Sequence, residues 1–305
     1  MFKYIMKRLL LGLFTLFVLV AITFTMTKLM PGSPLQSKNV SGELLEKMEA
    51  QYGLDKPVIQ QFFIYCKNLL KGDLGTSYKK IGTNVTDIIK QSMIPTLKLG
   101  IVTSILVLVV GIFAGIMMAK SKTALGKGAW LTGLTLGVSV PNFLVALLLM
   151  IVFGVVLNAV PIIGLSTPKH YIIPAIAQGL YPISAVARLT QSSYEEVIRQ
   201  DYITMAKAKG ISKSTILFRH VLKNAMLPVI TYMGPMVAFL LTGSVTIEKI
   251  FTIPGLGREF TNAIINHDYT VVMGITIFMG AIIILCNLVA DVLCAVVDPR
   301  TRKSM

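Results

Sequence analysis

Asp291 is the first candidate for a chemical role in this sequence, because it is an acid placed well inside an apolar run, residues 269–297. A carboxylate inside a membrane span is by default a candidate for a proton or ion relay. The structural alternative is an ion pair with a basic residue near the membrane surface, since Asp291 lies less than about two helical turns from Asp298. We favour the ion pair, because proton-coupled carriers usually bury several acids and the apolar segments here offer one.

The sequence shows no other constellation typical of an enzyme. It contains no G-x-S-x-G, and its three cysteines and three histidines are too dispersed for a metal motif such as C-x-x-C or H-E-x-x-H. It also lacks G-x-x-x-x-G-K-[S/T], the loop that cradles nucleotide phosphates. We therefore predict no catalytic residue, no metal site and no cofactor on this chain. If the protein takes part in ATP-driven work, ATP and Mg²⁺ belong to a partner chain.

Three prolines stand inside apolar segments, at Pro141, Pro182 and Pro235. A proline in a membrane span leaves a backbone carbonyl without its partner, which is tolerated where neighbouring helices or a water-filled path satisfy it. Interrupted helices of this kind surround the transport sites of many carriers. These prolines, together with Asp291, are therefore candidates for lining or gating a pathway, and helix packing is the alternative for each proline.

A polar, basic stretch separates two apolar segments in the C-terminal half. Between positions 188 and 223 it holds seven Lys or Arg residues against three acids. Small side chains before Gly210 would let another surface approach closely, and Gly210 can end a short helix in the left-handed conformation. Ser212 can then cap a second helix that reaches about Leu222. Two short helices with a tight elbow would form a docking knob, and the alternative is a solvated loop with a glycine at a turn.

Composition indicates an all-α integral membrane protein. Hydrophobic residues make up 54% of the 305-residue chain, charged residues make up 14%, and the mean hydropathy is +0.73. The net charge of +15 fits the excess of Lys and Arg in cytoplasmic loops, and no basic patch is interleaved with aromatic residues as a nucleic-acid surface requires. We expect both termini to be cytoplasmic, because the segments then placed inside carry most Lys and Arg of the short loops. Six spans are predicted, at about residues 9–30, 96–119, 130–158, 171–189, 224–247 and 269–297.

The polar region 31–95 follows the first span and is expected outside, since long loops translocate largely regardless of their charge. We predict three helices in it, from Ser41 to Gln51, from Pro57 to about Leu70 with Gly72 as a stop, and between Asn84 and Ser92. We interpret the region as a structured cap or partner-docking surface rather than a ligand-gripping domain. The predicted organisation is therefore 1–30, 31–95 and a core of 96–305 with the docking loop at about 190–224.

The docking knob resembles the cytoplasmic EAA loop of bacterial ABC importer permeases. The run Asp201-Tyr202-Ile203-x-x-Ala206-x-Ala208-Lys209-Gly210 looks like the peptide and nickel branch of that family. It departs from the general consensus, because the Glu-Ala-Ala positions read Thr204-Met205-Ala206 and Leu227-Pro228 lies five residues further from the glycine than usual. In the family this loop inserts a coupling helix into a groove of a separate ATPase. The resemblance therefore assigns ATPase coupling to Asp201, Tyr202, Ala206, Lys207, Ala208, Lys209, Gly210, Ile211 and Ser212.

Other stretches extend the resemblance over most of the chain, although Ser33 stands where the family favours Asp or Gly. The long region after the first span is similar to the first of the two unlike permeases in oligopeptide and dipeptide importers. The stretches are Pro31-Gly32-Ser33-Pro34, Gly72-Asp73-Leu74-Gly75-Thr76-Ser77-Tyr78, Phe251-Thr252-Ile253-Pro254-Gly255-Leu256-Gly257, Asn266-His267-Asp268-Tyr269, and Asp291 with Asp298-Pro299-Arg300.

The resemblance implies a second homologous permease, two ATP-binding subunits and an extracytoplasmic substrate-binding protein. It places the chain, with membrane lipid and no nucleic acid, in the bacterial cytoplasmic (inner) membrane. We therefore expect a permease subunit of an ATP-driven importer of oligopeptides or dipeptides. Nickel or a metal chelate is the alternative cargo, and a stand-alone secondary transporter or channel that uses Asp291 is the alternative class.

Overall fold

The structure is a computed structural model that describes residues 2–30, 53, 55–80, 82–165 and 167–297. Over these residues the chain is helical, and one isolated bridge between Thr76 and Asn84 is the β pairing they contain. Within this described part of the chain, five helical segments are long and apolar enough to cross a membrane. The all-α membrane fold is therefore confirmed. The five segments are α1 (Phe2–Leu29), α4 (Val85–Lys120), α7 (Ile172–Val197), α11 (Leu227–Thr242) with α12 (Val245–Ile250), and α14 (Tyr269–Val297).

A sixth crossing is made only if one sharply bent helix pair counts as a span. The span expected at 130–158, with Pro141 inside it, is therefore two helices that meet at a sharp bend rather than one helix. Pro141 has no N–H to donate and keeps Val140 extended, at φ −87° and ψ 126°, so the first helix stops there. The pair is α5 (Ala124–Ser139) and α6 (Asn142–Leu149) with its π-helical continuation η1 (Met150–Val156), and it is bent by 102°.

α4 is continuous where we expected a short helix over 84–92 and a separate span from residue 96. The predicted domain boundary at residue 95 therefore falls inside one helix. Pro95 is accommodated because the buried stripe of the helix runs straight past it. At helical spacing the buried positions before and after the proline include Val85, Ile88, Ser92, Thr96, Leu99 and Thr103.

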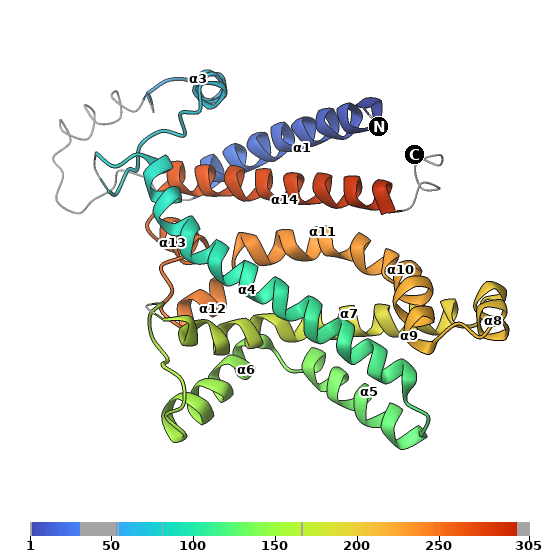
Figure 1. The fold of residues 1–305 in the computed structure, drawn as a ribbon. Coiled ribbons are helices and arrows are strands. Elements are labelled where there is room, and N and C mark those ends of the chain that lie inside the picture. The colour runs from blue at the N-terminus through green and yellow to red at the C-terminus, as the bar shows by residue number, and fades with distance from the viewer. Residues whose placement is uncertain (1, 31–52, 54, 81, 166, 298–305) are drawn as a thin grey trace.

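The long helices pack around α4, α7 and α11. Figure 1 shows α1 and α14 side by side on one flank, with α11 next to α14 and α4 crossing toward α7. The core between the three central helices includes Val107, Val186 and Leu240, all 0% exposed. α5 and α6 spread from the other flank and both contact α7.

The two ends of the bundle carry different short elements. α8 (Asp201–Ala208) lies at one end, and α3 (Val58–Leu70), α12 and α13 (Leu256–Ile265) lie at the other (Figure 1). α3 follows Pro57, and Gly72 stands just after its end with φ 77°, as predicted. The predicted helix at 41–51 and the motif residues 31–34 and 298–300 lie outside the described residues.

Candidate functional site

The predicted docking knob is present as a short helix with a sharp turn. α8 ends at Ala208 with Lys209 as its C-cap, and Gly210 follows in the left-handed conformation with φ 72°. The N–H of Ile211 then donates to the carbonyl of Ala206 over 3.2 Å, which closes the end of the helix. The backbone conformation predicted for Gly210 is therefore confirmed.

A second capped helix continues from this turn. The N–H of Thr215 donates to the hydroxyl of Ser212 over 3.3 Å, so the predicted N-cap is confirmed. The helix reaches slightly beyond the predicted end at Leu222. It consists of α9 (Lys213–Thr215), the π-helical η3 (Ile216–Val221) and α10 (Leu222–Ala225).

One face of α8 is buried and the opposite face is exposed. Ile203 is 0% exposed and Ala206 is 7% exposed, and both pack in one cluster with side chains of α7 and η3. Asn224 Nδ2 donates to the hydroxyl of Tyr202 over 2.9 Å, which ties α8 to α10. A helix fixed on one side can pass a displacement to the bundle. Among the residues assigned to coupling, those exposed are Asp201, Tyr202, Lys207, Ala208, Lys209, Gly210 and Ser212, whereas Ile211 is half-buried.

α7 reaches the knob because it is longer than predicted. It runs to Val197, about two turns past the predicted end of the fourth span at Leu189. Tyr194 is 8% exposed, because it packs beneath α8. The contact between Tyr194 and α8 explains why α7 continues for the extra turns. α7 therefore continues directly from the membrane span to the seat of the knob.

The three candidate prolines line one cavity of about 430 Å³. Pro141 comes from the α5–α6 bend, Pro182 from α7 and Pro235 from α11. The three prolines that the sequence analysis singled out therefore lie close together in the fold. The cavity walls are mostly apolar and aromatic, and none of the lining residues that the structure describes is charged. Tyr181 and Phe239 are 60% and 63% exposed, so the cavity opens to the outside of this chain.

Gln178 is the buried polar residue of this cavity, and sequence reasoning missed it, whereas Asn142 in the same wall is exposed. Its side chain is 5% exposed, and neither its amide oxygen nor its amide nitrogen has a hydrogen-bond partner within the described residues. A buried amide without partners costs about 1–3 kcal/mol, so such groups call for an explanation. The available signal was its place as the one amide in the apolar segment 171–189.

Asp291 lies apart from the cavity. Its Oδ2 is 2.9 Å from Nη1 of Arg8, in an ion pair that joins α14 to α1. The guanidinium of Arg8 also stands 5.5 Å from the ring centroid of Tyr4. This geometry favours the ion-pair interpretation over an ion relay. The described part of the chain also holds no group of three His, Cys, Asp or Glu residues that could bind a metal ion.

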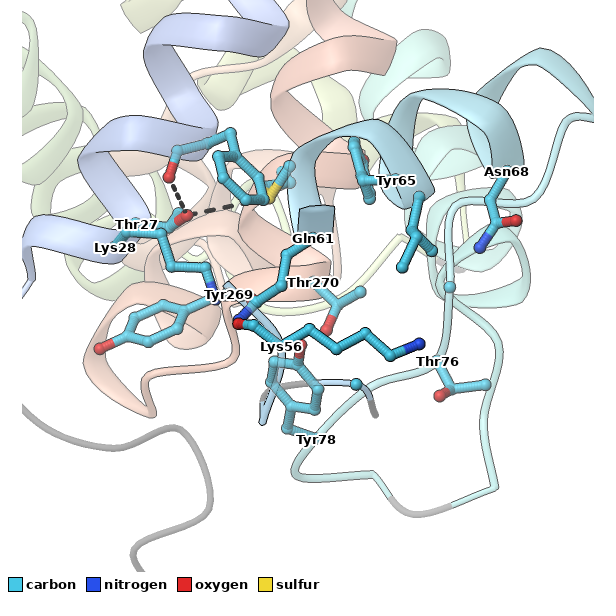
Figure 2. Close-up of a pocket in the computed structure, with 15 residues that line it drawn as sticks. Thr27, Lys28, Lys56, Gln61, Tyr65, Asn68, Thr76, Tyr78, Tyr269 and Thr270 are labelled. Carbon is cyan, nitrogen blue, oxygen red and sulfur yellow. Dashed lines mark hydrogen bonds between the residues drawn. The ribbon is translucent and has the colours of Figure 1, made fainter. Parts of the chain in front are cut away.

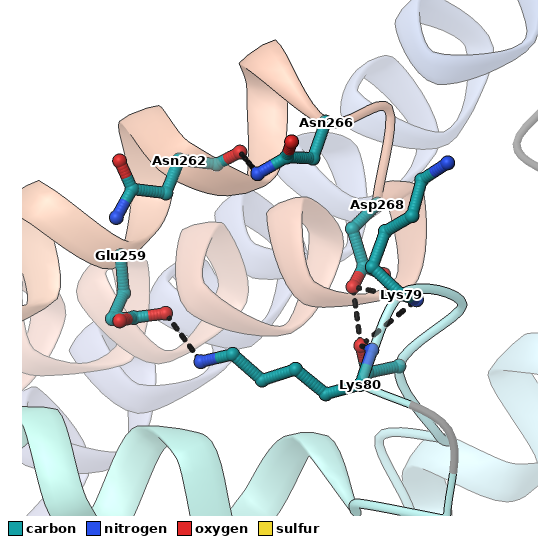
Figure 3. Close-up of polar contacts among 7 residues, drawn as sticks. Lys79, Lys80, Glu259, Asn262, Asn266 and Asp268 are labelled. Atoms are coloured by element: carbon teal, nitrogen blue, oxygen red, sulfur yellow. Dashed lines mark hydrogen bonds and ion pairs between the residues drawn. The ribbon is translucent and has the colours of Figure 1, made fainter.

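Two of the stretches that carry the family resemblance, 72–78 and 266–269, meet at the end of the bundle opposite α8. Asp268 is 4% exposed and accepts hydrogen bonds from the hydroxyl of Ser77 and, over 3.1 Å, from the N–H of Tyr78. Figure 3 shows Asp268 facing the turn at Lys79 and Lys80. The carboxylate therefore fixes the loop after α3 to the start of α14.

A third such stretch, 251–257, turns around the buried Glu248. Glu248 is 0% exposed; its Oε1 accepts from the hydroxyl of Thr96 over 2.8 Å and its Oε2 from the N–H of Arg258 over 2.9 Å. The hydroxyl of Thr96 in turn accepts from the N–H of Leu256 over 2.8 Å. This network attaches the α12–α13 corner to α4.

Comparison with known proteins matches this architecture to one family. Residues 111–303 match the family described as binding-protein-dependent transport system inner membrane component, and residues 1–100 match the N-terminal family of such membrane components. Among solved structures, one of inward-facing conformations of the MetNI methionine ABC transporter has the same fold, with a TM-score of 0.58 at 15% identity over 70% of this chain and 97% of that one.

Curated relatives align with nearly the whole chain. It is 41% identical over 302 residues to the dipeptide transport system permease protein DppB of Lactococcus lactis subsp. cremoris, covering 99% of this chain and 100% of that one. It is 37% identical over 305 residues to the oligopeptide transport system permease protein OppB of Haemophilus influenzae, again covering 99% and 100%. The chain thus belongs to the family of binding-protein-dependent transport system inner membrane components.

Proposed function

We propose that this chain is the first of two unlike permease subunits in an ATP-driven importer, and that peptides are its cargo. The observation that carries the proposal is α8, which rests on a buried seat and turns an exposed face outward from the end of the bundle. The printed names of relatives at 41% and 37% identity support a dipeptide or oligopeptide cargo.

α7 provides the mechanical link in this proposal. It carries Gln178 and Pro182 in the cavity and Tyr194 beneath α8. At about 1.5 Å per residue, Gln178 and Tyr194 stand roughly 24 Å apart along one helix. A displacement of α8 therefore tilts α7 as a rigid body and moves the cavity walls. In the proposed cycle, ATP binding closes two ATPase subunits and draws α8 inward, which opens the cavity outward, and hydrolysis reverses the motion.

The proposal places the α8 end in the cytoplasm with both chain termini, because the seven Lys or Arg residues between positions 188 and 223 favour that side. Its partners are a second permease, which would close the open side of the cavity, two ATPases, and a substrate-binding protein outside. ATP and Mg²⁺ are held by the ATPases.

A secondary transporter that works through Asp291 is the competing class. The Arg8–Asp291 pair weighs against it, because a paired carboxylate outside the cavity is poorly placed to carry an ion with the cargo. Nickel or a metal chelate is the competing cargo within the family.

Reconstitution tests the proposal. Proteoliposomes that contain this chain with its second permease and both ATPases should take up labelled tripeptide when the binding protein and ATP are supplied. Omission of either ATPase should abolish uptake, whereas uptake by this chain alone under an ion gradient would establish the secondary transporter. Uptake of a nickel chelate in place of peptides would reassign the cargo.

A further inference from the structure

A basic pocket lies at the end of the bundle opposite α8, between α3 and the adjoining ends of α1 and α14 (Figure 2). Its volume is about 340 Å³. Lys28 and Lys56 line it, and none of its lining residues among those described is Asp or Glu. Asp73 stands behind the wall, near enough to Tyr65 to help raise the pKa of that residue. The two ammonium groups line the pocket itself, and they favour an anion as its occupant.

Two hydroxyl groups without protein partners belong to residues that line the pocket and lie just behind its wall. The Tyr65 hydroxyl and Thr270 Oγ1 are buried, and neither has a hydrogen-bond partner within the described residues. Burial raises the pKa of Tyr65, so its hydroxyl keeps the proton and can donate it. Lys28 Nζ donates to the amide oxygen of Gln61 and lies 5.6 Å from the ring centroid of Phe24, both of which are neutral groups. These donors are of the kind that binds the oxygens of an oxyanion.

α3 forms one wall of the pocket and is amphipathic. Phe62 packs against α1, with its ring centroid 5.2 Å from that of Phe24. Ile59, Phe63 and Leu70 lie at helical spacing on another face, where they are 63%, 65% and 90% exposed. An apolar stripe on a helix with lysines nearby is typical of helices that lie in the membrane interface.

The orientation of α3 places this stripe beside lipid. Figure 1 shows α3 end-on next to the outer end of α1, so its axis runs crosswise to the spans. α1 itself exposes apolar side chains along the flank that α3 contacts, including Phe17 at 54% and Met26 at 61%. Lys28, at the end of the α1 span, stands where lysines reach lipid headgroups. The apolar stripe therefore continues the lipid-facing surface of α1.

We propose that this pocket binds the phosphate of an anionic phospholipid, while the exposed stripe of α3 lies among the upper parts of the acyl chains. Lys28 and Lys56 supply the charge, and the Tyr65 and Thr270 hydroxyls become donors when their side chains turn toward the phosphate. In Figure 2 the Lys56 side chain extends toward Thr76, and its flexible four-carbon stem lets the ammonium swing toward a bound phosphate. The lipid would hold the region after α1 against the membrane.

Native mass spectrometry of the detergent-solubilised full chain, titrated with phosphatidylglycerol, tests this assignment. We expect wild-type protein to retain one phosphatidylglycerol more tightly than phosphatidylcholine, whose choline cation is disfavoured by the lysines. Lys56→Gln and Lys28→Gln should each weaken that binding about tenfold, which corresponds to about 1.4 kcal/mol. Lys67→Gln is the matched control, because Lys67 is an exposed lysine of α3 that does not line the pocket.

Three results would overturn the assignment. Equal binding by wild type and Lys56→Gln would show that the pocket does not hold the headgroup. An equal loss in Lys67→Gln would reduce the effect to the general charge of α3. Displacement of the lipid by inorganic phosphate or by a tripeptide would assign the pocket to a soluble anion instead.

Discussion

Arg8 and Asp291 form an ion pair between the first and the last described helices, with 2.9 Å between Nη1 and Oδ2. The two side chains are 42% and 25% exposed, so the pair lies at the edge of the α1–α14 contact. It gives a charged partner to Asp291, the one acid that the sequence places well inside an apolar segment. The pair therefore explains Asp291 without a role in ion transport.

Asp291→Asn is accordingly expected to leave ATP-driven uptake close to the wild-type rate at both mildly acidic and mildly alkaline pH. Because partly exposed ion pairs contribute about 0.2–1 kcal/mol, the loss of stability should stay below about 1 kcal/mol. Arg8→Gln should have the same effect, and the double variant should lose little more than either single variant. Uptake by proteoliposomes and thermal unfolding measure the two effects. Loss of uptake in Asp291→Asn would instead support a role of Asp291 as an ion relay.

Asp268→Asn should weaken the attachment between the start of α14 and the loop that follows α3. The buried Asp268 carboxylate accepts from the Ser77 hydroxyl and from backbone N–H groups, and an amide can satisfy fewer of these donors. We expect a loss of about 1–3 kcal/mol in unfolding free energy and faster proteolysis between α3 and α4.

Glu259→Gln is the matched control for Asp268→Asn. It removes the ion pair in which Lys80 Nζ lies 2.9 Å from Glu259 Oε2 at the same end of the bundle. Since Lys80 is 54% exposed there, the change should cost less than about 1 kcal/mol. Equal effects of the two substitutions would show that Asp268 does not anchor the loop.

Gln178→Leu should reduce peptide uptake about tenfold or more and leave assembly with the ATPases unchanged. The proposed pathway cavity holds this one buried amide, which can pair with the backbone amides of any peptide. Gln178→Asn keeps the amide on a shorter stem and should retain part of the uptake. Uptake and co-purification of the subunits measure the two effects. If Gln178→Leu instead disrupts assembly, the amide pairs with the second permease rather than with cargo.

Features that depend on local backbone chemistry were predictable from the sequence. Gly210 adopts the left-handed conformation and Ser212 caps the next helix because each residue type fits that geometry wherever it occurs. The start of α3 after Pro57 follows the same logic. Five of the six spans were predictable because long apolar runs have few other uses, whereas the bend within 130–158 was not.

The effect of each proline was not predictable, because packing decides it. Pro95, Pro182 and Pro235 remain inside helices, whereas Pro141 ends one, although all four have the same local chemistry. Pro95 is retained because buried positions continue on both sides of it along α4. No such pattern in the sequence separates it from Pro141.

Contacts between distant residues were equally beyond sequence reasoning. Asp268 and Ser77 are separated by 191 positions, and nothing local marks them as partners. Gln178 was missed for a related reason, since a lone amide in an apolar segment says nothing of whether a neighbour will satisfy it. That three prolines surround one cavity could likewise be seen only from the fold.

The measurement that tests the central claim most directly is co-purification of the ATPases with this chain carrying Gly210→Asp, combined with peptide uptake. A Cβ at Gly210 would meet no atom within 4 Å, so the fold tolerates the substitution apart from the strain of φ 72°. Gly210→Asn is the matched control, because Asn has nearly the same size and tolerates this conformation. If α8 is the coupling element, Gly210→Asp should insert normally yet lose the ATPases and uptake by at least about tenfold, with a smaller loss for Gly210→Asn. Normal ATPase recovery and normal uptake with Gly210→Asp would contradict the account.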